Sequence, residues 1–258
     1  MKTQIKPYLI FFAITVIAGC HKEESFKTVT ADDASSATKL FARPNIIVIL
    51  ADDIGYEVPT YTGGQSYSTP NLDFMAANGT QFTQAHSAPL CSPSRFMLLT
   101  GKYNFRNYTT WGKMDTSQRT FANIAKSNGY ATCVAGKWQF NGGDASIRAF
   151  GFDKYLVTNP YEFNYIDSGN LKFYKDPKVF EKGAYWPTSV TKGKYGDDLI
   201  RDYMFHFIDS VKSVRPFLIY WATNLVHEPF APHPMILNLL HGIQTRQQSQ
   251  AIQFTLNQ

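Results

Sequence analysis

The stretch Asn45-Ile46-Ile47-Val48-Ile49-Leu50-Ala51-Asp52-Asp53 decides the fold, because it joins a continuous apolar run to a pair of acids. Residues 46–50 are apolar and mostly β-branched, which is typical of a strand that is buried on both faces. Such strands belong to parallel sheets that carry helices on both sides. We therefore expect an α/β fold in which Asp52 and Asp53 lie at the carboxyl end of the first strand, where open sheets of this kind bind ligands.

Further strands and helices alternate along the chain. The predicted helices span residues 69–76, 120–127 and 197–211, and the further predicted strands span residues 130–135 and 216–221. A capping-type residue stands before Pro70, and Gly79 is placed to end the first of these helices. The alternation predicts a mostly parallel sheet flanked by helices.

The composition is that of a globular protein. Of the 258 residues, 44% are hydrophobic and 15% are aromatic, which allows a sizeable core. The formal net charge is +5, and the basic residues are scattered without a long run. We therefore expect no nucleic-acid partner, while a weakly positive surface would suit an anionic substrate.

The N-terminus has the pattern of an export signal. Lys2 and Lys6 precede an apolar segment, residues 8–18, that is too short to span a membrane comfortably. Its end, Val16-Ile17-Ala18-Gly19-Cys20, resembles the bacterial lipobox. We expect residues 1–19 to be a lipoprotein signal peptide and Cys20 to be acylated, which would anchor the exported protein to the bacterial outer membrane on the periplasmic or surface side. An ordinary cleaved signal or a buried helix is the alternative.

A second group of reactive residue types follows the first predicted helix. It reads Cys91-Ser92-Pro93-Ser94-Arg95, with Leu99-Thr100-Gly101-Lys102 directly after it. A disulfide between Cys91 and Cys133 is one alternative in an exported protein, but it leaves Pro93 and Arg95 without a role. A thiolate activated by Arg95 and a helix N-terminus is another. A tyrosine phosphatase would need a longer, glycine-rich loop than the three residues between Cys91 and Arg95.

The paired acids are candidates for metal ligands. Two adjacent carboxylates repel each other unless a cation neutralises them. Oxygen-rich sites suit hard cations such as calcium or magnesium. Taken alone, Asp52 and Asp53 could equally cap the next turn or helix.

Five motifs in order along the chain resemble the sulfatase family and cover residues 43 to about 234. They are Asp52-Asp53-Ile54-Gly55-Tyr56, Thr69-Pro70-Asn71-Leu72-Asp73, the block from Cys91 to Lys102, Gly136-Lys137-Trp138, and the region of His227. The resemblance implies the alkaline-phosphatase-like fold and hydrolysis of sulfate esters, with sulfated carbohydrate or an aryl sulfate as substrate. It also implies that a sulfatase-maturating enzyme oxidises Cys91 to formylglycine.

The resemblance assigns roles to individual residues. Asp52, Asp53 and Cys91 would bind a calcium ion, and Cys91, as formylglycine, would be the nucleophile. Arg95 would steady the formylglycine hydrate, Lys137 would bind sulfate oxygens, and His227 would help the leaving alcohol depart. These residue types suit covalent catalysis with cationic clamps and a proton-transferring histidine. Lys137 as a solvated lysine, and His206 or His233 in place of His227, are the alternatives.

Two departures from the family pattern stand out. Gln139 occupies the position where many sulfatases have histidine, and an amide cannot take up a proton. The family also continues for another subdomain that carries further metal ligands, whereas residues 235–258 lose family character. We therefore divide the chain into the signal peptide 1–19, a flexible tether 20–42, a partial sulfatase N-terminal domain 43–234, and a divergent tail 235–258 that is truncated or frameshifted.

Competing functions follow from these departures. One is a phosphate or phosphonate ester hydrolase of the same superfamily. Another is a non-catalytic surface lipoprotein that binds sulfated glycans. A third is a misfolded gene fragment whose sheet exposes an unpaired edge that is prone to aggregation.

Overall fold

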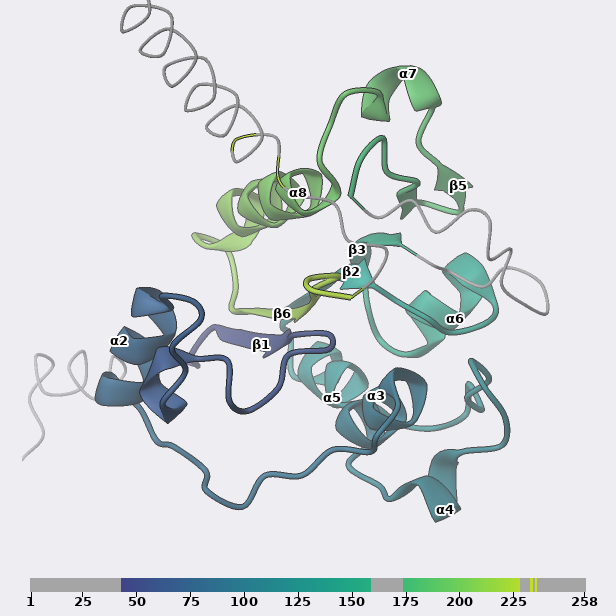
Figure 1. The fold of residues 1–258 in the computed structure, drawn as a ribbon. Coiled ribbons are helices and arrows are strands. Elements are labelled where there is room, and N and C mark those ends of the chain that lie inside the picture. The colour runs from purple at the N-terminus through teal and green to yellow at the C-terminus, as the bar shows by residue number, and fades with distance from the viewer. Residues whose placement is uncertain (1–42, 159–173, 228–232, 234, 236–258) are drawn as a thin grey trace, which may run out of the picture. The chain divides into compact units, whose positions relative to one another are not determined.

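The structure is a computed structural model that describes residues 43–158, 174–227, 233 and 235 (Figure 1). The predicted signal peptide, Cys20, the tether and residues 236–258 lie outside the described residues. Among the described residues, no helix is long and apolar enough to cross a bilayer.

The strands of the described chain form one 6-stranded sheet in the order β1-β6-β2-β3-β4-β5. Their bounds are β1 Ile46–Leu50, β2 Ala131–Lys137, β3 Lys154–Thr158, β4 Phe180–Glu181, β5 Ala184–Tyr185 and β6 Phe217–Ala222. The pairs β1–β6, β6–β2 and β2–β3 are parallel, and β3–β4 and β4–β5 are antiparallel. The prediction of a mostly parallel sheet is confirmed.

Helices connect and cover these strands. They are η1 Thr60–Thr62, α2 Pro70–Asn78, α3 Cys91–Thr100, α4 Asn104–Asn107, α5 Phe121–Ser127, α6 Gly143–Ala149, α7 Thr188–Thr191 and α8 Gly196–Val211. The predicted helices at 69–76, 120–127 and 197–211 are confirmed as α2, α5 and α8. Local signals explain their ends: Pro70 occupies the first turn of α2, and Thr120 caps α5 through a reciprocal capping box with Asn123.

The two faces of the sheet carry separate apolar clusters, because successive strand residues point to opposite sides. On one face, Ile200, Met204 and Phe207 of α8 pack with Cys133 and Ile219. Their spacing of four and three residues places them on one side of the helix. On the other face, α3 and α5 pack against the opposite side chains of β2 and β6. In Figure 1, α8 lies on one side of the sheet, and α3 and α5 lie on the other.

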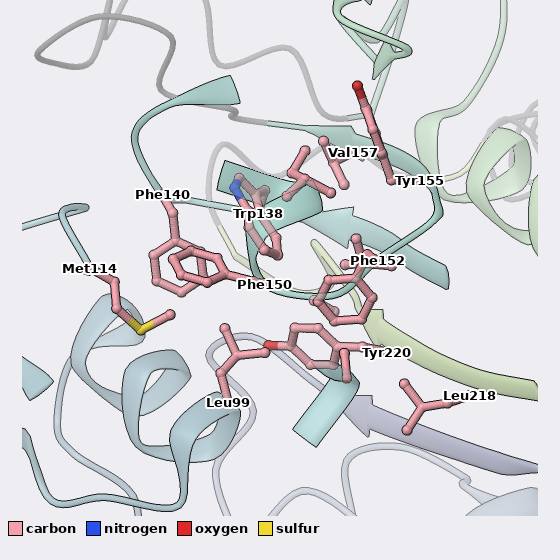
Figure 2. Packing of buried hydrophobic residues seen from close by; sticks show 14 of the residues in the cluster. Leu99, Met114, Trp138, Phe140, Phe150, Phe152, Tyr155, Val157, Leu218 and Tyr220 are labelled. Atoms are coloured by element: carbon pink, nitrogen blue, oxygen red, sulfur yellow. The ribbon is translucent and has the colours of Figure 1, made fainter. Parts of the chain in front are cut away.

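Aromatic rings dominate the cluster beneath α3 and α5 (Figure 2). Trp138 and Phe140, which directly follow β2, pack edge to face with ring centroids 4.9 Å apart. Phe140 stacks on Phe96 of α3 at 5.0 Å. Such pairs contribute about 0.5–1.5 kcal/mol each beyond the burial of their area. The packing therefore fixes the backbone on the carboxyl side of Lys137 and ties it to α3.

The expectation that residues 46–50 are buried on both faces is wrong. Val48 and Leu50 pack against the aromatic cluster, but Ile47 is 51% exposed and Ile49 is 47% exposed on the other face. In the described chain β1 lies at the edge of the sheet, with β6 as its neighbour, and α8 packs over β2, β3 and β6 instead. The apolar run is therefore typical of a central strand of a sheet, although β1 is an edge strand in the described chain.

Candidate active site

The carboxyl ends of the parallel strands bring the predicted residues together. Asp52 follows β1 by two residues, Lys137 is the last residue of β2, and Arg95 reaches the same place from α3. Because β1, β6 and β2 run parallel, their carboxyl ends share one edge of the sheet. The side chains of Arg95 and Lys137 are each 1% exposed, and that of Asp52 is 5% exposed.

Asp52 is held between two cations. Arg95 Nη2 donates to Asp52 Oδ1 at 3.3 Å, and Lys137 Nζ donates to Asp52 Oδ2. Arg95 Nη1 also donates to the Lys137 carbonyl at 3.1 Å and to the Tyr220 hydroxyl at 3.3 Å. Burial raises the pKa of Tyr220, so its hydroxyl stays neutral and can accept this bond.

This ionic cluster contains one more positive charge than negative charge. Arg95 and Lys137 are both cations, whereas Asp52 supplies a single carboxylate. Arg95 Nε is buried and has no hydrogen-bond partner among the described residues. Buried charge that is not balanced is costly, so an anion bound beside the cluster would lower its energy. The local electrostatics therefore favour a negatively charged ligand.

Asp53 faces a different partner from its neighbour. Its φ is 56°, in the left-handed region that aspartate tolerates better than most residues. Its side chain is 59% exposed, and Oδ2 lies 3.6 Å from His227 Nε2. The left-handed turn allows adjacent carboxylates to point to different groups, Asp52 to the two cations and Asp53 to the imidazole.

His227 lies on a loop, residues 223–227, that we call the histidine loop. Asp52 N donates to Leu225 O at 3.0 Å, and Val226 N donates to Asp52 O at 2.8 Å. These bonds fasten the histidine loop to the end of β1. Of the rival histidines, His206 is exposed on α8, and His233 Nε2 lies 2.8 Å from Asp198 Oδ2.

Cys91 is the first residue of α3 and is partly buried. Arg95 follows it by four residues, so the two lie on one side of the helix, and Arg95 contacts Asp52. The next residue, Ser92, donates through Oγ to Gln139 O at 3.4 Å. The start of α3 is thus tied both to the end of β1 and to the chain after β2.

The alternative of a disulfide between Cys91 and Cys133 is wrong. Both cysteines are free. Cys133 lies in the apolar cluster beneath α8, whereas α3, which begins at Cys91, packs on the other face of the sheet. Burial raises the pKa of the Cys133 thiol, so Cys133 is an inert core residue.

The proposed calcium ligands do not form a cluster by themselves. In the part of the chain that the structure describes, no group of three or more His, Cys, Asp or Glu side chains could hold a metal ion. Both oxygens of Asp52 contact cationic side chains. Asp52 and Asp53 supply the carboxylate oxygens that calcium prefers, and the full ligand set with Cys91 stays a prediction.

Four residues near the site were not predicted from the sequence. They are Tyr174, Asp197, Tyr220 and Asn224. Tyr220 sits inside an apolar strand, and no motif marks its contact with Arg95. A signal did exist for Asn224, because it is a polar residue that follows the carboxyl end of a buried strand.

Gln139, which departs from the family pattern, is 4% exposed, and its Oε1 has no hydrogen-bond partner among the described residues.

Comparisons with known proteins agree with this arrangement. An N-acetylgalactosamine-6-sulfatase from Canis lupus familiaris is 32% identical over an alignment of 220 positions, which covers 75% of this chain and 42% of the relative. An N-acetylgalactosamine-6-O-sulfatase from Bacteroides thetaiotaomicron is 30% identical over an alignment of 284 positions, which covers 86% of this chain and 54% of the relative. The chain thus spans about half, or less, of the length of these relatives.

Solved structures give the same fold. A structure described as a complex with its substrate D-glucosamine-2-N,6-O-disulfate superposes with a TM-score of 0.63 at 26% identity, over 78% of this chain and 38% of that chain. Another, from work on glycosaminoglycan metabolism by Bacteroides thetaiotaomicron, gives a TM-score of 0.60 at 26% identity, over 75% of this chain and 53% of that chain. These structures share the alkaline-phosphatase-like fold. The profile of the family described as Sulfatase matches residues 44–238, and the chain therefore belongs to the sulfatase family.

Proposed function

We propose that this chain hydrolyses sulfate esters of an exported or environmental carbohydrate, with a formylglycine made from Cys91 as the nucleophile. The observation that carries the proposal is the buried cluster of Arg95, Lys137 and Asp52, with its surplus positive charge, at the edge of the sheet where α3 begins. A sulfate ester is the kind of anion that such a cluster would stabilise.

The side chains divide the work of binding and proton transfer. Lys137 would exchange its contact with Asp52 for the sulfate oxygens. Arg95 would stay in place, because its guanidinium also holds the Lys137 carbonyl and the Tyr220 hydroxyl. His227 would donate a proton to the leaving oxygen, since imidazole changes its charge near neutral pH.

The carboxylates at this edge support the proposal of a calcium site, because they are the kind of oxygen ligand that calcium binds. Asp52 and Asp53 would supply oxygen ligands, and residue 91 would supply a further one. When bound, the ion would offset negative charge on the sulfate group.

Amino sugars that carry a 6-O-sulfate are the substrates to test first. The relatives reported above are named for N-acetylgalactosamine 6-sulfate, and the ligand of one solved structure is D-glucosamine-2-N,6-O-disulfate. This choice is our inference for the present chain.

The test is release of sulfate by chain co-produced with a sulfatase-maturating enzyme and assayed with calcium. N-acetylgalactosamine 6-sulfate and an aryl sulfate are the substrates, and mass spectrometry reports the state of residue 91. We expect formylglycine and sulfate release in the unchanged chain, and neither in Cys91→Ala. Retention of the sulfated sugar without sulfate release would instead identify a glycan-binding protein, and release of phosphate from a phosphate ester in place of sulfate would identify the phosphatase alternative.

We also propose that the chain is exported and anchored through Cys20. The support is the lipobox-like sequence before this residue. In a bacterial host, labelled palmitate should enter the unchanged chain but not Cys20→Ala. Equal labelling of both would refute acylation at Cys20.

A further inference from the structure

The Tyr174 side chain contacts the histidine loop through hydrogen bonds to its backbone. Its hydroxyl lies 2.8 Å from the carbonyl oxygen of Asn224 and 2.6 Å from that of His227, and these two acceptors share its single proton. The same Asn224 carbonyl accepts from His227 N at 3.0 Å. Tyr174 is 3% exposed, and burial raises its pKa, so the hydroxyl remains a donor at neutral pH.

Asn224 ties the histidine loop to a second place in the sheet. Its side chain is fully buried, and Oδ1 accepts from Thr158 Oγ1 at 2.7 Å. Thr158 is the last residue of β3, which β2 separates from β6. Loss of a buried hydrogen bond of this kind costs stability, because it leaves a buried polar group without a partner. The loop is therefore held at β1 by its backbone and at β3 by the Asn224 amide.

The hydrogen bonds made by Tyr174 and by the Asn224 carbonyl include two to the backbone of His227, the residue whose side chain faces Asp53. The backbone of His227 is bonded at its N–H and at its carbonyl, and its Nε2 lies 3.6 Å from Asp53 Oδ2. Because hydrogen bonds hold both backbone groups of His227, the position of its imidazole depends on the contacts that Tyr174 and Asn224 make with the loop. A displacement of about 1 Å at a reacting group can cost on the order of a hundredfold in rate.

We propose that Tyr174 and Asn224 are positioning residues that hold the imidazole of His227 beside Asp53. The consequence for catalysis rests on the proposed function, in which His227 serves the leaving oxygen. The structural part concerns hydrogen bonds of this chain alone. It can therefore be tested in chain that has no formylglycine and no metal.

The test is a double-mutant cycle read from the imidazole signals of His227 by NMR, in the full chain with chelator present. His227→Gln identifies these signals. Asp53→Asn should shift them in the otherwise unchanged chain, because the two groups lie 3.6 Å apart. In a Tyr174→Phe background the same substitution should shift them by about half as much or less, since the groups are no longer held together.

Tyr155→Phe is the matched control. Tyr155 is also a buried tyrosine, with a hydroxyl that contacts Asp144 and Gly183 rather than the histidine loop. The Tyr155→Phe substitution should lower the free energy of unfolding without changing the shift that Asp53→Asn causes in the imidazole signals of His227. If Tyr174→Phe does not fold, Thr158→Val replaces it, because it removes the bond to the Asn224 amide.

An unchanged effect of Asp53→Asn in the Tyr174→Phe or Thr158→Val background would overturn the proposal. Where the matured chain is active, Tyr174→Phe should lower kcat and leave KM nearly unchanged. A chain that folds but releases no sulfate in any variant would count against the proposed function, while the NMR cycle would still decide the positioning role.

Discussion

At the scale of single residues, the distinctive feature is a carboxylate shared by two buried cations. Asp52 accepts from Arg95 and Lys137, and Arg95 extends the network to Tyr220. Parallel strands made the meeting of these residues predictable from the sequence. The choice of partners was not predictable, because it depends on the left-handed backbone at Asp53 and on packing between distant segments.

Removal of the shared carboxylate should cost more stability than removal of either cation. Asp52→Asn leaves two buried cations without a counter-charge, and we expect a loss of about 3–5 kcal/mol in the free energy of unfolding. Lys137→Met leaves Asp52 paired with Arg95 and should cost less. Urea denaturation with chelator present measures both.

The pair of Lys126 and Asp153, 2.6 Å apart and with side chains 49% and 32% exposed, gives the control. Asp153→Asn should cost less than about 1 kcal/mol, because exposed ion pairs contribute little. A larger loss for Lys137→Met than for Asp52→Asn would contradict a cluster with surplus positive charge.

At the scale of elements, the long regular segments were predictable and the short ones were not. Strong apolar runs identified β1, β2 and β6, and caps and periodicity identified α2, α5 and α8. The five residues of β3 and the two-residue strands β4 and β5 escaped prediction, because their pairing depends on neighbours far along the chain. The prediction that β1 is buried on both faces was also wrong, because the apolar pattern of a strand does not say whether a helix covers each of its faces.

The first turn of α8 carries a buried acid that should make stability depend on pH. Asp197 is 8% exposed, and neither carboxylate oxygen has a hydrogen-bond partner among the described residues. Burial raises its pKa from 3.8 to about 6, although nearby amide groups of Asn224 oppose the rise. The folded chain therefore binds a proton more tightly than the unfolded chain does.

It follows that the contribution of Asp197 to stability is present at low pH and is lost as the pH rises from about 4 to 6. The loss should amount to roughly 3 kcal/mol. Asp197→Asn should remove this part of the pH dependence, whereas Asp202→Asn, an exposed acid on the same helix, should leave it in place. Denaturation curves at several pH values measure it, and parallel curves for the unchanged chain and Asp197→Asn would refute the assignment.

At the scale of the whole molecule, the outer edge of β1 is the weak point, because among the described residues β1 pairs with β6 alone. Three isoleucines of this strand are exposed, Ile46 by 38%, Ile47 by 51% and Ile49 by 47%. An exposed apolar edge strand is a template for pairing with another chain. We expect self-association that increases with protein concentration.

Ile47→Lys with Ile49→Lys should reduce this association, because charged side chains protect sheet edges. Val214→Lys is the control, since Val214 is 79% exposed but lies outside the sheet. Light scattering over a range of concentrations measures the mean mass. A chain that stays monomeric throughout, or associates equally in all three proteins, would show that the edge has no such role.

The most direct test of the central claim is a crystal structure of the matured chain soaked with selenate, which replaces sulfate and scatters anomalously. The account predicts a selenium peak placed so that a selenate oxygen accepts a hydrogen bond from Lys137 Nζ, with residue 91 and the carboxylates of Asp52 and Asp53 nearby. A peak elsewhere, with residue 91 remote from both aspartates, would contradict it.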